Sequence, residues 1–248
     1  MSETIIPKNP TLFLCNGTSG AGLSTAIDGI TKLGLATKPA TQFTTRALRP
    51  NERRGDQFYS VPLEALDKIP GEVSLKAENY GNTYGFFHPG VRKMRKLLVT
   101  QNIILDALNS RQEWQTVLGE NTKIITVYFA PSSPDISLQR IIMRSEQTGF
   151  KLSSEELAIR IAGNSDNISK VREFDYWLDT TNLESVLPTL RSIIYYYSFG
   201  LEVLPLATSV ISNPDLIENL ISHFLLSTSE NKSGYNEYLL KQKGKNTI

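Results

Sequence analysis

The sequence predicts an α/β protein whose parallel β-sheet is covered by helices on both faces. Three short runs are rich in branched apolar residues, as buried parallel strands are, and they span 11–16, 103–108 and 123–129. Stretches with helical periodicity separate or follow these runs, near 24–33, 109–118, 134–146, 153–170 and 183–197. Such alternation is typical of parallel sheets, because the crossover between neighbouring parallel strands usually contains a helix.

The composition excludes several classes of protein. The 248 residues carry 26 Lys and Arg against 25 Asp and Glu, so the net charge of +1 excludes a strongly basic nucleic-acid-binding protein and an acidic disordered chain. A single cysteine excludes a disulfide scaffold and a cysteine-based zinc site. The N-terminus has no signal-peptide pattern, and no apolar run reaches the roughly 18 residues of a membrane span. We therefore expect a soluble, cytoplasmic protein that binds neither nucleic acid nor membranes.

A glycine-rich loop lies between the first predicted strand and the first predicted helix. It reads GTSGAGLST over 17–25 and matches the phosphate-binding P-loop pattern GxxxxGK[ST] except at the lysine, which is replaced by Leu23. Its N–H groups and helix dipole can still bind an anion, and Ser24 is positioned to bind Mg²⁺. However, losing one charge-stabilising donor typically lowers the rate on the order of 10²–10³-fold. The alternative is a loop kept for its tight turn, with no nucleotide.

Two further segments complete the predicted organisation. Residues 41–95 hold several Gly, Pro and aromatic residues and an arginine cluster, with little helical periodicity, which favours a small β-rich insertion. A helix is predicted from Pro214, because Asn213 can cap it and proline suits its first position. One face of this helix is apolar, with Leu216, Ile217, Leu220, Ile221, Phe224 and Leu225. The segment 227–248 is polar and is expected to be flexible.

Five blocks in order resemble the guanylate kinase family over roughly residues 10–197. They are the loop 17–25, TTRALRPNE at 44–52 with GDQF at 55–58, AENYGNTYG at 77–85, FAPSS at 129–133, and FDY at 174–176. The resemblance implies a three-layer P-loop kinase fold with a parallel sheet, a small β-rich substrate-binding insertion and a helical lid, here with an extra C-terminal helix. It implies a domain over 10–200, a substrate-binding subdomain at 41–95, a lid at 134–165, and a C-terminal extension with a flexible tail at 201–248.

The resemblance also assigns candidate nucleotide and metal ligands. The nucleotide-binding positions are Gly17, Ser19, Gly20, Ala21, Gly22, Leu23, Ser24 and Thr25, with Ser24 also on the metal. The catalytic positions of the lid are Arg140, Arg144 and Arg160, which would neutralise phosphate charge and partly replace the missing lysine. Asp106 ends a predicted strand where the family places an acid near the metal. A solvated arginine face and a strand-end cap are the respective alternatives.

The positions that would bind the acceptor fall into two groups. The phosphate-binding positions are Arg46, Arg49, Phe58 and Tyr84, of which only Phe58 has lost the family's hydroxyl. The three guanine-reading positions have become apolar, as Leu75, Phe86 and Leu108. Each buried polar group of guanine left unpaired would cost about 1–3 kcal/mol, which argues against guanine specificity. A local shift in the alignment could let Glu72 or Glu78 stand in for the glutamate.

Two functions remain open from the sequence. The first is a guanylate-kinase-like protein with a degenerate nucleotide site, which acts as an anion-binding, phospho-ligand-binding or regulatory module and is not a normal GMP kinase. The second is an active ATP-dependent kinase that uses Mg²⁺ and phosphorylates GMP or another phosphorylated small molecule. The C-terminal helix could contact a protein partner or a second copy of the chain, or pack onto its own domain.

Overall fold

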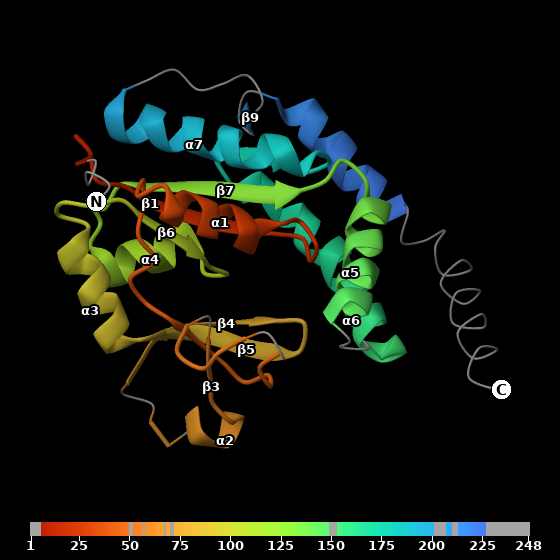
Figure 1. Ribbon diagram of the computed structural model, residues 1–248, viewed down its shortest axis with the longest axis horizontal. Coiled ribbons are helices and arrows are strands. Elements are labelled where there is room, and N and C mark those ends of the chain that lie inside the picture. Colours follow the sequence, from red (N-terminus) through yellow and green to blue (C-terminus); the bar gives the residue numbers. More distant parts are fainter. Residues whose placement is uncertain are drawn as a thin grey trace.

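The main β-sheet of the computed structural model has five strands in the order β6-β1-β7-β8-β9 (Figure 1). The structure describes residues 6–49, 52–56, 58–66, 68–69, 72–148, 153–200, 207–209 and 213–226. The strands are β1 (Leu12–Gly17), β6 (Ile103–Asp106), β7 (Ile124–Ala130), β8 (Tyr176–Asp179) and β9 (Ala207–Ser209). The first four are parallel and β9 is antiparallel to β8. The prediction of a parallel sheet in an α/β protein is therefore confirmed.

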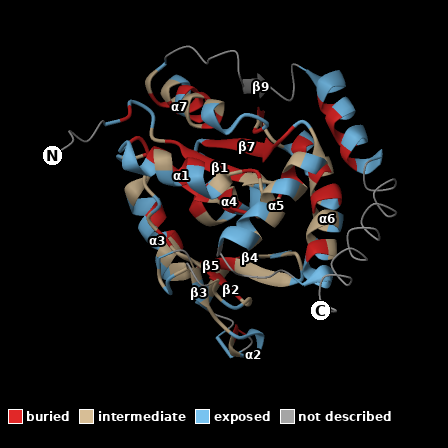
Figure 2. Cartoon of the chain, turned by 45° about the vertical axis from the view of Figure 1, so that its right-hand side comes forward, coloured by how far each residue is buried: buried red, intermediate tan, exposed pale blue. Residues whose placement is uncertain are grey.

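Side chains that alternate along the strands build a core on each face of this sheet. On one face, Phe13 and Cys15 of β1 belong to a cluster with α1 (Leu23–Lys32) and α7 (Leu183–Phe199). On the other face, Leu12 and Leu14 pack with α3 (His88–Leu97) and α4 (Arg111–Leu118). The result is three layers, and Figure 2 shows β1 and β7 as buried strands between exposed helix surfaces.

A second, four-stranded sheet in the order β3-β2-β5-β4 forms the β-rich insertion. Its elements are β2 (Gln42–Thr44), β3 (Phe58–Ser60), α2 (Leu63–Leu66), β4 (Val73–Asn79) and β5 (Asn82–Phe87). The predicted β-rich stretch of 41–95 extends too far, because α3 begins at His88. Pro89 occupies the first turn of α3, and Val91 and Met94 on one face of that helix are buried.

Two helices, α5 (Pro134–Thr148) and α6 (Ser154–Ile168), form the segment predicted as the lid. A capping box of Ser153 and Glu156 fixes the start of α6. A short 3-10 helix, η2 (Ser169–Glu173), connects α6 to β8. In Figure 1 the pair stands beside the turn that joins β4 and β5, at one side of both sheets.

A helix at 214–226 confirms the predicted C-terminal helix and packs onto the chain's own domain. Its buried residues are Ile217, Leu220, Ile221 and Phe224, in a cluster with Tyr128, Ala130, Ile168, Val171 and Trp177. Leu216 and Leu225 of the predicted apolar face are exposed instead. Glu218 bonds Arg172, and His223 Nδ1 lies 3.2 Å from the carbonyl oxygen of Ser132. The tail predicted to be flexible, 227–248, lies outside the described residues.

None of the helices within the described ranges is long and apolar enough to span a bilayer.

Candidate functional site

The glycine loop connects β1 to α1 and leaves the first turn of α1 open to an anion. Gly20 and Gly22 have φ values of 87° and 79°, a left-handed conformation that glycine adopts without steric cost. Gly22 caps α1 without a side-chain hydrogen bond, and the first turn carries no acidic residue. The unpaired N–H groups of this turn and the helix dipole therefore favour a phosphate.

Leu23 occupies the position at which the P-loop pattern has a lysine, and its side chain packs against the core. It is partly buried and packs against the apolar cluster between the sheet, α1 and α7. The loop thus keeps its backbone donors and has no cation of its own at this position. The neighbouring Ser24 and Thr25 are exposed.

Both lid helices contact the loop. Thr18 and Ser137 of α5 pair their hydroxyl oxygens at 3.3 Å. From α6, Asn164 accepts a hydrogen bond from the N–H of Ser19 at 2.7 Å, and Arg160 Nη1 donates to the Ser19 hydroxyl at 3.3 Å. The loop, Arg160 and the lid, which the sequence predicted as parts of one site, are therefore adjacent.

Two arginines of the insertion share a single carboxylate. Arg46 donates two hydrogen bonds of 2.7 Å to the two carboxylate oxygens of Glu52, and Arg49 Nη1 lies 3.5 Å from the same group. The guanidinium of Arg46 also lies 4.9 Å from the centre of the Phe58 ring, and Phe58 packs edge-on against Tyr84. Phe58 therefore supports Arg46 by cation–π contact even without a hydroxyl.

Four arginines lie close enough for their positive charges to affect the pKa of Arg49 or of one another. Burial, and then the positive charges of Arg46, Arg144 and Arg160, lower the pKa of Arg49 to about 10. Desolvation, followed by the charge of Arg160, likewise lowers the pKa of Arg144, although its side chain is exposed at the surface. Burial acts to raise the pKa of Glu52, but its bonds from Arg46 and the Arg49 N–H hold it below its usual value. Four positive charges thus face one close carboxylate, an arrangement suited to a ligand with several negative charges.

Arg140, predicted with these arginines, is held elsewhere. Its guanidinium donates to the carbonyl oxygens of Thr180 and Thr181 at 2.8 and 2.9 Å, at the end of β8. Arg140 and Arg144 are four residues apart on α5 and therefore share a helix face. Their guanidinium groups nevertheless lie in different places. The catalytic role of Arg140 stays a prediction.

Asp106 ends β6, as predicted, beside Cys15 in the register of β1. Burial raises the pKa of Asp106 to about 6, and the charge of Lys38 only partly offsets this. Among the described residues, no three acidic, histidine or cysteine side chains gather as a metal cage. Magnesium often takes only one or two protein ligands and completes its shell with phosphates and water, so Asp106 and Ser24 remain compatible with it.

The three predicted guanine-reading positions lie in apolar surroundings. Leu75 and Phe86 pair across β4 and β5, are 7% and 1% exposed, and pack with Trp114 in the core under α3 and α4. Leu108 follows β6 and is partly buried. The alternative readers Glu72 and Glu78 are both exposed. These three positions therefore have apolar side chains where a guanine-binding site would need hydrogen-bonding groups.

Three residues of the site were missed from the sequence: Glu52, Tyr80 and Asn164. Glu52 lay within a quoted block, TTRALRPNE, and its spacing of three from Arg49 was a usable signal. Tyr80 also lay within a quoted block, and its hydroxyl bonds Asn164 at 2.7 Å. Asn164 had no signal, because a polar residue within a helix is ordinarily taken as solvent-exposed.

Comparisons with known proteins show the family to which the chain belongs. The family model for guanylate kinase matches residues 10–197. A guanylate kinase from Colwellia psychrerythraea is 28% identical over 200 residues, which cover 77% of this chain and 85% of that protein. One from Shewanella sp. is 29% identical over 190 residues, covering 74% and 86%. A solved guanylate kinase from Anaplasma phagocytophilum shares the fold, with a TM-score of 0.53 at 18% identity over 79% of this chain and 89% of that one. Because the family model spans most of its length, the chain belongs to the guanylate kinase family.

Proposed function

We propose that the chain is an ATP-dependent kinase that transfers a phosphoryl group to GMP or to another phosphorylated small molecule. The observation that carries this proposal is the convergence of four arginines, two from the insertion and two from the lid, next to the glycine loop. Phosphoryl transfer brings two phosphate-bearing molecules together, and catalysis consists mostly of positioning and charge stabilisation. A cluster contributed by the insertion and the lid is suited to both tasks.

The roles follow from which element holds each side chain. Arg46 and Arg49 would bind the acceptor phosphate, with Glu52 fixing their orientation. Arg144 and Arg160 would neutralise the charge of the transferring group, which the loop's missing lysine leaves uncompensated. The open N–H groups at the start of α1 would bind the donor phosphates. Magnesium, held by Ser24 and near Asp106, would supply further charge neutralisation.

The arginine cluster specifies that the acceptor carries a phosphate, but it does not specify the rest of the acceptor molecule. The relatives named as guanylate kinases favour GMP. Leu75 and Phe86 are buried in the core and provide no hydrogen-bonding group for a base, which favours an acceptor whose other end makes few hydrogen bonds. An acceptor panel must therefore include phosphorylated molecules besides nucleotides.

A second candidate function is supported by Leu23. A leucine in the core at the lysine position weakens phosphoryl transfer more than it weakens anion binding. Under this candidate, the chain binds a phospho-ligand through the arginine cluster as a regulatory module and transfers nothing.

One experiment separates the two candidates. Purified protein is incubated with Mg-ATP and a panel of GMP, other nucleoside monophosphates and sugar phosphates, while ADP formation and the thermal shift are measured. The kinase proposal expects ADP with at least one acceptor. No ADP and no stabilisation by Mg-ATP would contradict it, and stabilisation by phosphates without turnover would favour the second candidate.

The variant Leu23→Lys sharpens this test. It restores a cation beside the donor phosphates, so kcat should rise on the order of 10²–10³-fold if the rest of the site is intact. Leu33→Lys, the same change at an exposed position after the far end of α1, is the matched control and should change nothing. Equal effects of both variants would show that the added charge acts non-specifically.

A further inference from the structure

Asn164 connects three parts of the molecule that are far apart in sequence. It is 5% exposed, on the lid helix α6. Its Oδ1 accepts hydrogen bonds from the Ser19 N–H of the glycine loop and from the hydroxyl of Tyr80, both at 2.7 Å. Its Nδ2 donates to the Ser19 carbonyl oxygen at 3.4 Å. One side-chain amide therefore holds the lid, the loop and the insertion together.

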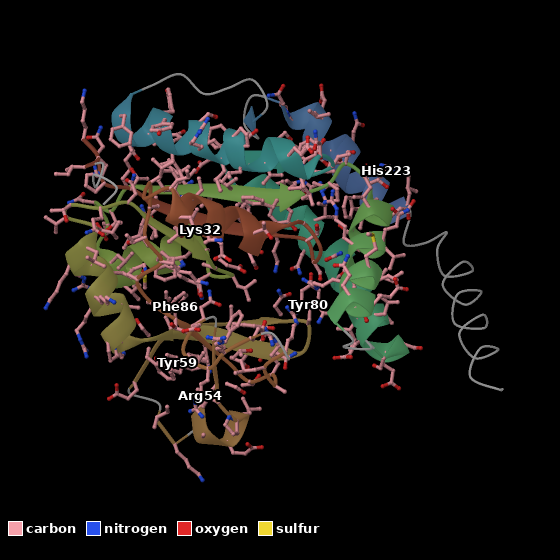
Figure 3. All side chains as sticks on the ribbon, viewed as in Figure 1. Lys32, Arg54, Tyr59, Tyr80, Phe86 and His223 are labelled. Atoms are coloured by element: carbon pink, nitrogen blue, oxygen red, sulfur yellow. The ribbon has the colours of Figure 1, made fainter. Side chains whose placement is uncertain are left out.

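Tyr80 and Gly81 form the two-residue turn between β4 and β5, and both have the positive φ that such a hairpin turn uses. The φ of Tyr80 is 50°, which makes it the one left-handed non-glycine residue in the described part of the chain. Its ring lies so close to α6 that a Cβ on Gly163 would sit 2.4 Å from a ring carbon, so only glycine fits beneath it. Burial raises the pKa of Tyr80 above its usual value, so its hydroxyl stays a donor at neutral pH. Figure 3 shows Tyr80 between the insertion and the lid helices.

Arg160 lies one helical turn before Asn164 and shares both of its neighbours. It donates to the Ser19 hydroxyl, and its guanidinium carbon lies 6.0 Å from the centre of the Tyr80 ring. Its buried Nε has no hydrogen-bond partner among the described residues. The guanidinium is thus held at the loop while retaining an unused donor.

We propose that Asn164 is a positioning residue, a latch that closes the lid onto the loop and the insertion and thereby holds Arg160 at the phosphate site. The latch consists of Asn164, Tyr80 and Ser19. Its bonds join protein groups alone, so they favour the closed lid whether or not a nucleotide is bound. Its contribution to catalysis rests on the proposed phosphoryl transfer, but its effect on lid closure does not.

A closed lid has a particular advantage in this chain. Where the loop lacks its lysine, charge neutralisation depends more heavily on the lid arginines. A lid that is closed by its own hydrogen bonds positions those arginines in advance, which lowers the cost of ordering them when a ligand binds.

Lid closure can be measured without any activity. Spin labels are attached at Glu64→Cys on α2 and Glu155→Cys on α6, both exposed positions, while the native Cys15 is buried. The labelled protein with an intact latch should give one narrow distribution of distances between the two spin labels in the absence of ligand. Asn164→Ala and Tyr80→Phe should broaden it toward longer distances, whereas Asp166→Asn, an exposed change on the same helix, should not. An unchanged distribution in Asn164→Ala would overturn the latch.

Conservative rescue and kinetics separate positioning from folding. Asn164→Asp keeps an acceptor for the Ser19 N–H and the Tyr80 hydroxyl but loses the Nδ2 donor, so its distribution should be narrower than that of Asn164→Ala. Tyr80→Phe, which keeps the ring, should retain the native melting curve. If the chain transfers phosphate, Asn164→Ala should lower kcat about 10-fold or more, as expected when buried hydrogen bonds are lost. Tighter Mg-ATP binding in Asn164→Ala would instead mean that Asn164 competes with phosphate for the Ser19 N–H, contradicting the proposal. If the Asn164→Ala distance distribution is broader but the native protein transfers no phosphate, the latch is supported and the proposed kinase activity is contradicted.

Discussion

The small sheet of the insertion is charged near Arg46 and apolar near Phe86. At one end, Arg46, Arg49 and Glu52 form a charged group that is joined by the lid arginines, and burial disfavours the charge of Arg49. At the other end, Leu75 and Phe86 are absorbed into the core with Trp114, where Phe86 packs edge-on at 5.1 Å between ring centres. At the charged end the Arg46–Glu52 pair stabilises the fold, the extra charge of Arg49 is unfavourable, and the group is suited to bind phosphate. The apolar end raises stability and has no polar groups with which to read a base.

The difference teaches that two parts of one small sheet can have opposite chemistry, one charged and partly exposed, the other apolar and buried. Burying a charge costs desolvation energy, and replacing a buried charged group with neutral groups is often neutral or stabilising. Burying an apolar side chain such as Phe86 stabilises the fold directly. The predictions below test whether each end behaves as assigned, from the largest expected effect to the smallest.

Phe86→Ala should destabilise the protein by about 3–5 kcal/mol, since it opens a cavity in a core where Phe86 is 1% exposed. Urea unfolding measures the change. If the position were instead part of an open base pocket, the loss would stay below about 1 kcal/mol, and the apolar end would need reinterpretation. Val99→Ala, at an exposed residue after α3, is the control.

Asp106→Asn should stabilise the protein at pH 7 by about 2–3 kcal/mol. Burial raises the pKa of Asp106 to about 6, so the folded state holds its proton more tightly than the unfolded state. The native chain therefore loses stability as the pH rises from about 4 through 6, and the asparagine variant does not. The stability difference should vanish below pH 4, which unfolding curves at several pH values would test. A constant difference would contradict the titration of Asp106.

Arg46→Ala should destabilise by about 2 kcal/mol, because it leaves the largely buried Glu52 with a weaker partner. Since the bonds from Arg46 lower the pKa of Glu52, that stabilisation is present above about pH 4.5 and is lost as the pH falls through the lowered pKa. The difference between the variant and the native chain should therefore shrink in acid. Calorimetry with inorganic phosphate should also show weaker binding.

Arg49→Gln should have the smallest effect on stability, between no change and a gain of about 1 kcal/mol. Its buried positive charge is disfavoured by three neighbouring arginines, so removing it relieves repulsion. Phosphate affinity should nevertheless fall about 10-fold, as expected for a lost charged hydrogen bond. A clear loss of stability would show that Arg49 supports the fold rather than the ligand.

Much of the fold could be predicted from local patterns. The apolar runs, the glycine loop and the capping signals act within a few residues, so they predicted β1, β6, β7 and most helices to within a few positions. Helix α3 was missed because its charged face, with Arg92 and Lys93 exposed, obscured the buried pair of Val91 and Met94.

The sequence by itself determined the order of the blocks, the leucine at position 23 of the glycine loop, and the apolar character of Leu75, Phe86 and Leu108. Only the tertiary structure decided where these residues lie: Arg140 bonds the end of β8, the C-terminal helix covers its own domain, and Asn164 meets Ser19, 145 residues away. The physical reason is the distance along the chain over which each kind of interaction acts. Backbone sterics and periodicity operate along the chain and can be read from it, whereas the contacts of a buried amide or a guanidinium depend on how whole elements pack.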